Sequence, residues 1–395
     1  MKYFRMVLPL LLACNSIPAA AVTLTWSIPA GERMEMTRTA QVKFLVNDRP
    51  EKTYEERNII DLTCTDTRDG ASRVQGIFTV YRRDREKDVF RLEEQYTSGF
   101  EIGLLGHFTV PKQNYMPNLR NIPAFPGRDV KAGDTWSADA ELVFDMFSEP
   151  FKLTFPVLYG LKKLEKKGDS GIAEIQFDFL INMDLAGGKY PADFPVKILG
   201  KDEGTLYWDI SGNHPVSMKE KYRIIFFFPS DGKKLTANEF RMIIDTSICM
   251  YKPVTREQKE EHRHALEKEV PRGIDVDTDK RGLVLRLGDV LFDFDFAGLR
   301  EESRAALDRI AGILAGKYPD REIIVEGHTD ATGGADYNLR LSRDRAETVA
   351  RYLRQRAGTE KLSYRGFGPD RPIAGNDTRD GRQKNRRVEI IIKLQ

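Results

Sequence analysis

The sequence predicts an α+β protein in two parts: a mainly antiparallel β region, then a sandwich with helices on one face of a mixed sheet. The first observation is the length of 395 residues, which is enough for two or three domains. The second is a change of period. Apolar residues recur at every second position up to about residue 251, whereas helical stripes begin only after about residue 273. The third is the composition. With 41% hydrophobic residues, 31% charged residues and a net charge of +2, the chain is typical of globular domains and offers no argument for nucleic acid as a partner.

Residues 1–21 are expected to be an export signal. Lys2 and Arg5 give a positive start, and residues 6–13 (MVLPLLLA) form an apolar core that is too short to anchor a chain in a membrane. Residues 19–21 are three alanines, small enough for cleavage by a signal peptidase. The protein is therefore expected to leave the cytoplasm.

The three cysteines fit a chain that is exported from the cytoplasm. Residues 11–14 (LLAC) also resemble a lipobox, in which Cys14 would be acylated and become the first residue of the mature chain. Ordinary cleavage would instead remove Cys14. Cys64 and Cys249 remain in either case, an even number in a compartment that permits disulfides. They are expected either to bond to each other or to stay as two buried free thiols, because sequence does not show proximity.

Residues 22–251 are expected to form a β-rich domain of no family that the sequence reveals. Apolar side chains alternate with mostly polar neighbours most clearly along one strand, at Ile175, Phe177, Phe179, Ile181 and Met183. Such alternation indicates a strand with one buried face. Further strands are expected within residues 76–83, 204–218 and 221–228. The three tryptophans of this region are expected to lie in its core.

Residues 252–272 are expected to be a charged linker, helical over about 255–268. It contains His262 and His264, which point to different faces of a helix because they are two positions apart. A metal shared by these two side chains is therefore not expected.

Residues 273–395 are expected to form the sandwich. The order of elements is strand, helix, strand, helix, strand, strand, a βαβαββ arrangement, and it predicts helices on one face of a mixed sheet. The segments that carry these patterns are 283–292, 306–314, 321–327, 338–354, 362–368 and 386–394.

Arg345 is the residue of the second helix whose role the helix does not explain. It shares a stripe with Asn338, Leu341 and Val349, at spacings of three and four residues. The two apolar members indicate that this stripe faces protein. A guanidinium held against an apolar surface is costly unless it is paired. The nearest plausible partner is Asp330, in the loop before the helix.

Two interpretations of Asp330 and Arg345 remain open from the residues alone. They form a structural ion pair, or they stand apart and bind the ammonium and the carboxylate of an amino-acid end. Gly327, Gly333 and Gly334 would let the loop turn tightly and bring backbone N–H groups close to a ligand. The N-terminus of the helix adds partial positive charge.

Four segments of this region resemble one family. They read VLFDFD…LR, VEGHTDATGGADYNLRLSRDRA, GFGPDRPIAGN and GRQKNRRVEI, at 290–300, 325–346, 366–376 and 381–390. In this order and spacing they are similar to the OmpA-like peptidoglycan-binding domain, a family that includes the C-terminal part of OmpA, the lipoprotein Pal and the stator protein MotB. The resemblance runs from about Gly273 to Gln395.

The resemblance implies a ligand and a set of residues that bind it. The ligand would be the diamino acid in the peptide stem of peptidoglycan, usually meso-diaminopimelate, with Asp330 on its ammonium and Arg345 on its carboxylate. Five further positions match the pocket of the family: Phe294, Asp295, Thr329, Asn338 and Leu341. Four others match its C-terminal signature, which we interpret as mainly structural: Arg382, Asn385, Arg386 and Arg387.

The expected function is therefore binding without catalysis and without a metal or cofactor. The protein would act in the periplasm or at the inner face of the outer membrane, with or without a lipid anchor. Two alternatives remain. One is an envelope hydrolase, because carboxylate pairs leave no sequence signature. The other is a β domain that binds lipid or an unknown envelope protein, with the C-terminal domain serving only to localise it.

Overall fold

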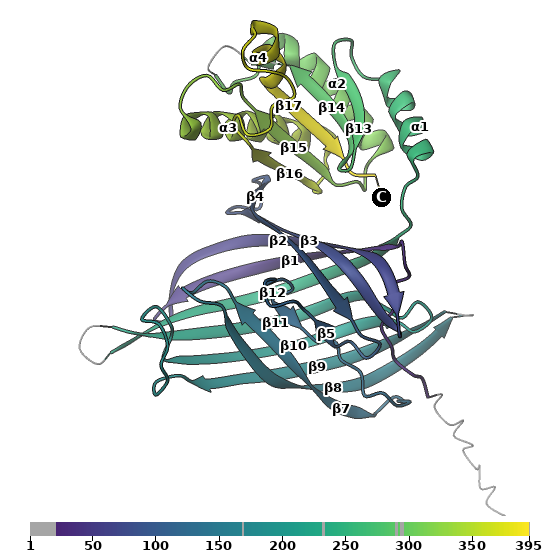
Figure 1. Cartoon of the computed structure of the whole chain (residues 1–395), viewed down its shortest axis with the longest axis vertical. Helices are drawn as coiled ribbons and strands as arrows, with labels where there is room; N and C mark the ends of the chain where they lie inside the picture. Colours follow the sequence, from purple (N-terminus) through teal and green to yellow (C-terminus); the bar gives the residue numbers. More distant parts are fainter. Residues whose placement is uncertain (1–20, 168–169, 231–233, 289–290, 293–295, 395) are drawn as a thin grey trace, which may run out of the picture.

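The structure of the chain is a computed structural model that describes residues 21–167, 170–230, 234–288, 291–292 and 296–394 (Figure 1). The expected export signal up to residue 20, with Cys14, lies outside the described residues, as do Phe294 and Asp295.

The N-terminal domain is one strongly curved antiparallel sheet of long strands (Figure 1). Its neighbours follow the order β7-β8-β9-β10-β11-β12-β1-β2-β3-β4, and only the pairing of β12 with β1 joins strands that are distant in sequence. The bounds are β1 Arg33–Val46, β2 Arg49–Arg68, β3 Ala71–Arg83, β4 Phe90–Ile102, β7 Thr135–Phe144, β8 Phe151–Lys167, β9 Ser170–Asp184, β10 Lys197–Asp209, β11 His214–Pro229 and β12 Leu235–Tyr251. Two short strands, β5 Phe108–Thr109 and β6 Leu119–Arg120, lie between β4 and β7.

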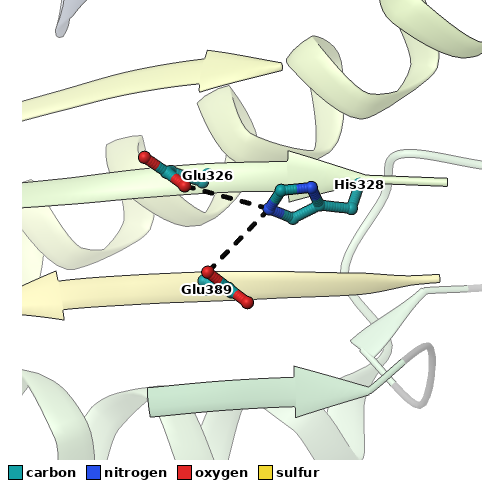
Figure 2. A group of neighbouring side chains, drawn as sticks. All are labelled: Glu326, His328 and Glu389. Atoms are coloured by element: carbon teal, nitrogen blue, oxygen red, sulfur yellow. Dashed lines mark ion pairs between the residues drawn. The ribbon is translucent and has the colours of Figure 1, made fainter. Parts of the chain in front are cut away.

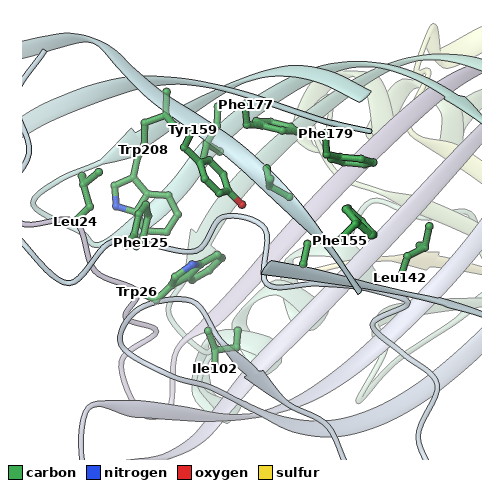
Figure 3. Packing of buried hydrophobic residues seen from close by; sticks show 14 of the residues in the cluster. Leu24, Trp26, Ile102, Phe125, Leu142, Phe155, Tyr159, Phe177, Phe179 and Trp208 are labelled. Carbon is green, nitrogen blue, oxygen red and sulfur yellow. The ribbon is translucent and has the colours of Figure 1, made fainter. Parts of the chain in front are cut away.

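The main hydrophobic core lies on the concave face of this sheet (Figure 3). The ring of Trp208 packs edge-on against Trp26 and against Phe125, each with ring centres 4.8 Å apart. Phe125 comes from the irregular segment between β4 and β7, so this segment covers part of the concave face. Trp26 and Trp136 donate their indole N–H groups to the carbonyls of Pro123 and Ala124. All three tryptophans are buried in this core, as expected from the sequence.

The two cysteines are free, Cys64 buried on β2 and Cys249 exposed on β12. Strand β1 pairs with both β2 and β12 and so separates them. Two strand spacings amount to about 10 Å, whereas a disulfide needs Cα atoms within about 7 Å. The disulfide interpretation is therefore wrong, and the alternative of buried thiols holds only for Cys64.

Helix α1, Arg256–Glu267, joins the two domains. Thr255 caps its N-terminus, accepting from the N–H of Gln258 while the Gln258 side chain accepts from the N–H of Thr255. Leu266 is buried in the core of the C-terminal domain, so this charged helix packs against that domain along one side. Among the described residues, no helix has the length and apolar character needed to cross a membrane.

The C-terminal domain is the expected sandwich, with a mixed sheet and helices on one face (Figure 1). The strand order is β13-β14-β17-β15-β16, and within it only β15 and β16 are parallel. The sequence did not predict β13 or the short helix α4. The bounds are β13 Asp275–Asp279, β14 Gly282–Gly288, α2 Glu301–Lys317, β15 Ile323–His328, α3 Ala335–Ala357, β16 Leu362–Gly366, α4 Arg379–Asn385 and β17 Arg387–Ile392.

The two domains are joined by a strand pairing. The start of β4 runs parallel to β16, with Phe90 opposite Ser363 and Arg91 opposite Tyr364. The side chain of Phe90 is buried beneath two guanidinium groups, those of Arg57 and Arg83, which lie 3.9 and 4.5 Å from its ring centre. The β domain thus adds a strand to the sheet of the C-terminal domain.

Candidate functional site

The candidate site lies where β15 ends and α3 begins, and two glycines bring these elements together. A Cβ atom on Gly327 would lie 1.9 Å from the carbonyl oxygen of Ser342, and one on Gly366 would lie 2.4 Å from the backbone nitrogen of Arg343. Real Cβ atoms do not approach other atoms so closely. Helix α3 can therefore rest on the ends of β15 and β16 only because both positions lack a side chain.

The loop between β15 and α3 is held by hydrogen bonds at both ends. The N–H of Thr329 donates to the carbonyl of Gly368 at 2.9 Å. The Oδ1 atom of Asp330 accepts from the N–H of Thr332, also at 2.9 Å, which closes a turn of the kind that aspartate favours. Asn338, at the start of α3, donates its side-chain amide to the carbonyl of Thr332. The structure therefore brings together three of the expected site residues, Thr329, Asp330 and Asn338.

Asp330 is 7% exposed, and its charge is already paired. Its Oδ2 atom lies 2.7 Å from Nη1 of Arg386. Burial alone would raise the pKa of Asp330, but the hydrogen bonds from Arg386 and Thr332 outweigh burial and hold that pKa below its usual value. Arg386, which the sequence suggested was mainly structural, thus contacts a residue of the candidate site.

Arg345 is 6% exposed and faces the chain that leads into α2. Its Nε atom donates to the carbonyl of Phe296 at 3.0 Å, and its guanidinium lies 5.2 Å from the ring centre of Phe292. No ion pair between described residues joins Arg345 to Asp330, whose carboxylate is paired with Arg386. The two side chains are thus held by separate contacts, on a loop and on the following helix.

Leu341 and the hydroxyl of Thr329 complete the described part of the expected site. Leu341 is half-buried on α3. Thr329 is buried, and its hydroxyl has no hydrogen-bond partner among the described residues. The places expected for Phe294 and Asp295 fall outside the described part of the chain.

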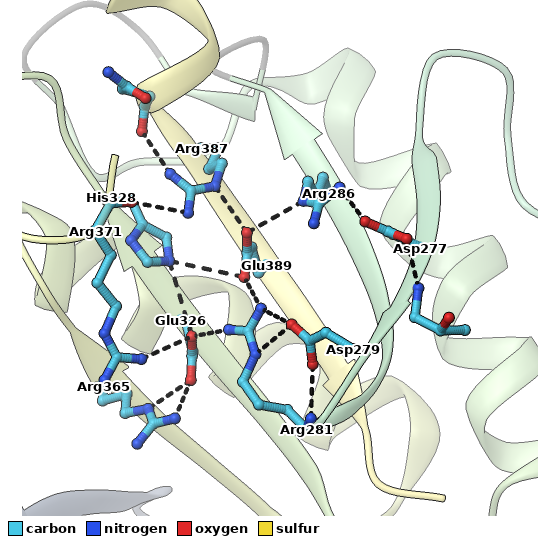
Figure 4. Close-up of polar contacts among 12 residues, drawn as sticks. Asp277, Asp279, Arg281, Arg286, Glu326, His328, Arg365, Arg371, Arg387 and Glu389 are labelled. Atoms are coloured by element: carbon cyan, nitrogen blue, oxygen red, sulfur yellow. Dashed lines mark hydrogen bonds and ion pairs between the residues drawn. The ribbon is translucent and has the colours of Figure 1, made fainter. Parts of the chain in front are cut away.

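A network of buried charges covers the face of the sheet opposite the helices (Figure 4). Glu326 on β15 and Glu389 on β17 are each at most 1% exposed. Arg281 contacts both carboxylates, Arg365 donates to Glu326 at 2.6 Å, and Arg387 donates to Glu389 at 2.8 Å. The sequence did not predict this network. Two of its pairs, Glu326 with His328 and Arg387 with Glu389, lie two positions apart on one strand, but only the folded sheet brings these strands together.

Glu326, His328 and Glu389 lie close enough for a metal ion to bind, with their potential ligand atoms within 4.8 Å of one another (Figure 2). The surrounding charges do not fit a cation, because guanidinium groups already occupy both carboxylates. Burial, reinforced by the charge of Arg387, lowers the pKa of His328 to about 3. We therefore interpret the group as part of the buried network.

Comparisons with known proteins agree on the nature of the C-terminal third. Residues 291–386 match the model of the OmpA family. Over 122 residues the chain is 38% identical to the probable lipoprotein YiaD of Escherichia coli (strain K12), covering 30% of this chain and 55% of that protein. Over 108 residues it is 43% identical to the outer-membrane lipoprotein YfiB of Pseudomonas aeruginosa, covering 27% of this chain and 63% of that protein. The chain thus spans less than two thirds of the length of either relative.

Among solved structures, the peptidoglycan-associated lipoprotein of Burkholderia pseudomallei is 30% identical, with 26% of this chain and 88% of that chain covered and a TM-score of 0.24. The name of YfiB ties that relative to the outer membrane. The protein is accordingly a cell-envelope protein, of the periplasm or the outer membrane, as the sequence predicted.

Proposed function

Since the C-terminal third of the chain is an OmpA-family domain, we propose that it binds the peptide stem of peptidoglycan and stations the β domain at the cell wall. The observation that carries this proposal is the placement of Asp330 and Arg345. They are opposite charges, both more than nine-tenths buried, and they are held on different elements rather than paired with each other. Such an arrangement suits a ligand that carries an ammonium and a carboxylate on one carbon.

In this proposal the ammonium of the diamino acid binds Asp330 in place of Arg386. Asp330 is fixed by its turn with Thr332, whereas the side chain of Arg386 is 26% exposed and is the partner with room to move. The carboxylate of the ligand binds the guanidinium of Arg345, which the carbonyl of Phe296 and the ring of Phe292 orient. Thr329 and Asn338 fix the loop between these two charges.

The magnitudes suit a reversible anchor. Hydrogen bonds to charged groups contribute roughly 1.5–3 kcal/mol each, and immobilising the ligand and the loop offsets part of this gain. A single site is therefore expected to bind modestly. The wall repeats its stem peptides, so that any second tether on the protein would raise the effective concentration and the overall affinity.

Sedimentation of the full chain with purified sacculi tests the proposal. The wild type is expected in the pellet, and free meso-diaminopimelate is expected to compete it into the supernatant. Asp330→Asn and Arg345→Gln are each expected to weaken binding by roughly 10- to 100-fold, the equivalent of one hydrogen bond to a charged group.

Arg343→Gln is the matched control, because Arg343 lies on the same helix with its side chain 45% exposed. This variant is expected to sediment like the wild type. Equal sedimentation of the wild type and both site variants would contradict the proposal. Release of soluble wall fragments in the same assay would instead identify a hydrolase, the alternative that the sequence left open.

A further inference from the structure

A row of polar side chains crosses the concave face of the β domain. It is formed by Asp202 on β10, Glu220 on β11, Thr246 on β12, Arg38 on β1 and Asn58 on β2. The strand registers place these residues next to one another. Thr246 lies opposite Arg38, and Arg38 lies opposite Asn58. Asp202 and Glu220 are diagonal neighbours, because Asp202 lies opposite Tyr222 and Glu220 lies opposite Gly204.

Apolar side chains flank this row on both sides along the strands. On β12 the neighbours of Thr246 on the same face are Ile244 and Ile248, and on β1 those of Arg38 are Met36 and Ala40. One flank belongs to the cluster of Ala40, Val42 and Ile244, and the other flank to the main core. The row is therefore a polar strip between two apolar surfaces.

Several atoms of the row are buried without a partner. Asp202 is 1% exposed and Thr246 is 6% exposed, yet Oδ1 of Asp202 and Oγ1 of Thr246 accept and donate no hydrogen bond among the described residues. The closest ionic contact in the row, between Arg38 and Glu220, is 3.4 Å long. Leaving a buried polar group without a partner costs about 1–3 kcal/mol, so these atoms point to something that binds there.

The buried part of the row also carries one carboxyl group too many. Asp202 and Glu220 share the single guanidinium of Arg38. Glu56, beside Asn58, accepts from the Asn58 amide, and its negative charge also acts on Arg38. Tyr222 is the remaining titratable group that faces Asp202. Burial, then the charge of Glu220, and a hydrogen bond with Glu220 raise the pKa of Asp202 to about 8, so a proton neutralises this carboxyl at neutral pH.

We propose that this row binds the ammonium group of an amphipathic amine, whose apolar part lies against the flanking clusters. The ammonium would take the place of the proton on Asp202 and donate to Asp202 and Thr246. A water molecule would supply hydrogen bonds but would not offset the extra charge. A divalent cation would bring two positive charges close to Arg38 and has no apolar part to lie against the flanking clusters. The function of the β domain would then be to hold such an amphiphile close to the wall.

Calorimetric titration of the full chain with octylammonium chloride tests this inference, with octanol as the neutral analogue and ammonium chloride as the head group alone. Octylammonium is expected to bind at least tenfold more tightly than octanol at pH 8.5, where a primary amine is still charged. Asp202→Asn is expected to reduce its affinity to that of octanol. Glu203→Gln, on the same strand but in an exposed ion pair with Lys201 on the opposite face, is expected to change nothing.

The pH dependence of the wild type gives a second readout that needs no variant. Because the ammonium displaces a proton, the affinity is expected to fall about tenfold per unit as pH drops below about 8, down to the ionisation of Asp202 in the complex. Equal binding of octanol and octylammonium would show that only an apolar surface is present. No binding of either compound would show that the row has a structural role alone. Either result would overturn the inference. If ammonium chloride competed as well as octylammonium at the same concentration, the row would bind a bare cation and not an amphiphile. That result would also overturn the inference.

Discussion

Asp330 has one oxygen on a backbone N–H and the other on Arg386, so a ligand at this carboxylate has to compete with a side chain of the protein itself. The sequence predicted the positions of Asp330 and Arg345 from helical spacing and from the resemblance. It did not predict the Arg386 contact, because 56 residues separate the partners and only the folded sheet brings them together. Local spacing reveals which side chains share a helix face, but it does not reveal which distant charge reaches them.

Arg386→Gln is predicted to strengthen the binding of free meso-diaminopimelate by about 3- to 10-fold. The variant removes the guanidinium that the ammonium of the ligand must displace. The ion pair of this partly exposed side chain with Asp330 contributes about 1 kcal/mol. Titration calorimetry on the full chain would measure the change. A loss of affinity would show instead that Arg386 contacts the ligand directly.

The buried network makes stability depend on pH in the acid range. His328 has a pKa of about 3 in the folded protein and about 6.5 when unfolded. Between these values only the unfolded chain binds this proton, so the contribution of His328 to stability is fully present above pH 6.5 and is lost as the pH is lowered. The slope from this one group is at most about 1.4 kcal/mol per pH unit.

Glu389 affects the stability of the protein at lower pH than His328 does. Burial alone would raise the pKa of Glu389, but Arg387 and its neighbours hold that pKa at about 2, so its contribution is lost only as pH falls from about 4.5 towards 2. Urea unfolding at pH 7, 6 and 5 is therefore predicted to show the wild type losing stability relative to His328→Asn as the pH is lowered. The variant is the reference because the raised pKa of Asp202 gives the whole protein an opposite slope over the same range. His262→Asn, on the exposed side of α1, is the control and should follow the wild type at each pH. A constant difference in stability between the wild type and His328→Asn from pH 7 to pH 5 would contradict the assignment.

At the scale of elements, the contact of α3 with β15 depends on the missing side chain of Gly327. Gly327→Ala is predicted to destabilise the protein by at least about 1–3 kcal/mol, the usual cost of overpacking, because the new methyl group meets the backbone of Ser342. Gly312→Ala on α2, where a Cβ meets nothing within 4 Å, is the control. It is expected to stabilise the helix by up to about 1 kcal/mol. Equal stability of both variants in urea unfolding would contradict this account of the packing.

The sequence predicted the long elements better than the short ones. The alternation along β9 and the apolar stripe of α2 were visible because each extends over many residues. Strand β13 reads DVDTD, with a single buried residue, and α4 has only seven residues, so neither carries a period that can be recognised. The order of the strands in the β domain was also beyond the sequence, since the pairing of β1 with β12 depends on the curvature of the whole sheet.

At the scale of the whole molecule, the contact between the domains depends on Phe90. Arg354 adds to it by donating to the carbonyls of Asp88 and Glu86 at 3.1 and 3.0 Å. Phe90→Ala is predicted to cost about 3–5 kcal/mol, as for other buried phenylalanines, and to loosen the pairing of β4 with β16. Hydrogen exchange followed by mass spectrometry should then show faster exchange in β16.

Phe100→Ala is the matched control for this prediction. Phe100 lies on the same strand and is similarly buried, but it belongs to the core of the β domain. It is expected to leave exchange in β16 slow under conditions where the β domain stays folded. Unchanged exchange of β16 in Phe90→Ala would show that the two domains dock by other contacts.

The pairing of β4 with β16 has a consequence for any piece of the chain studied alone. A fragment that starts near residue 273 would lack β4, and β16 would become an outer strand with its backbone N–H and C=O groups exposed. Outer strands of this kind are templates for pairing with a second molecule. The excised fragment should therefore self-associate as its concentration rises, whereas in the intact chain β4 blocks that route.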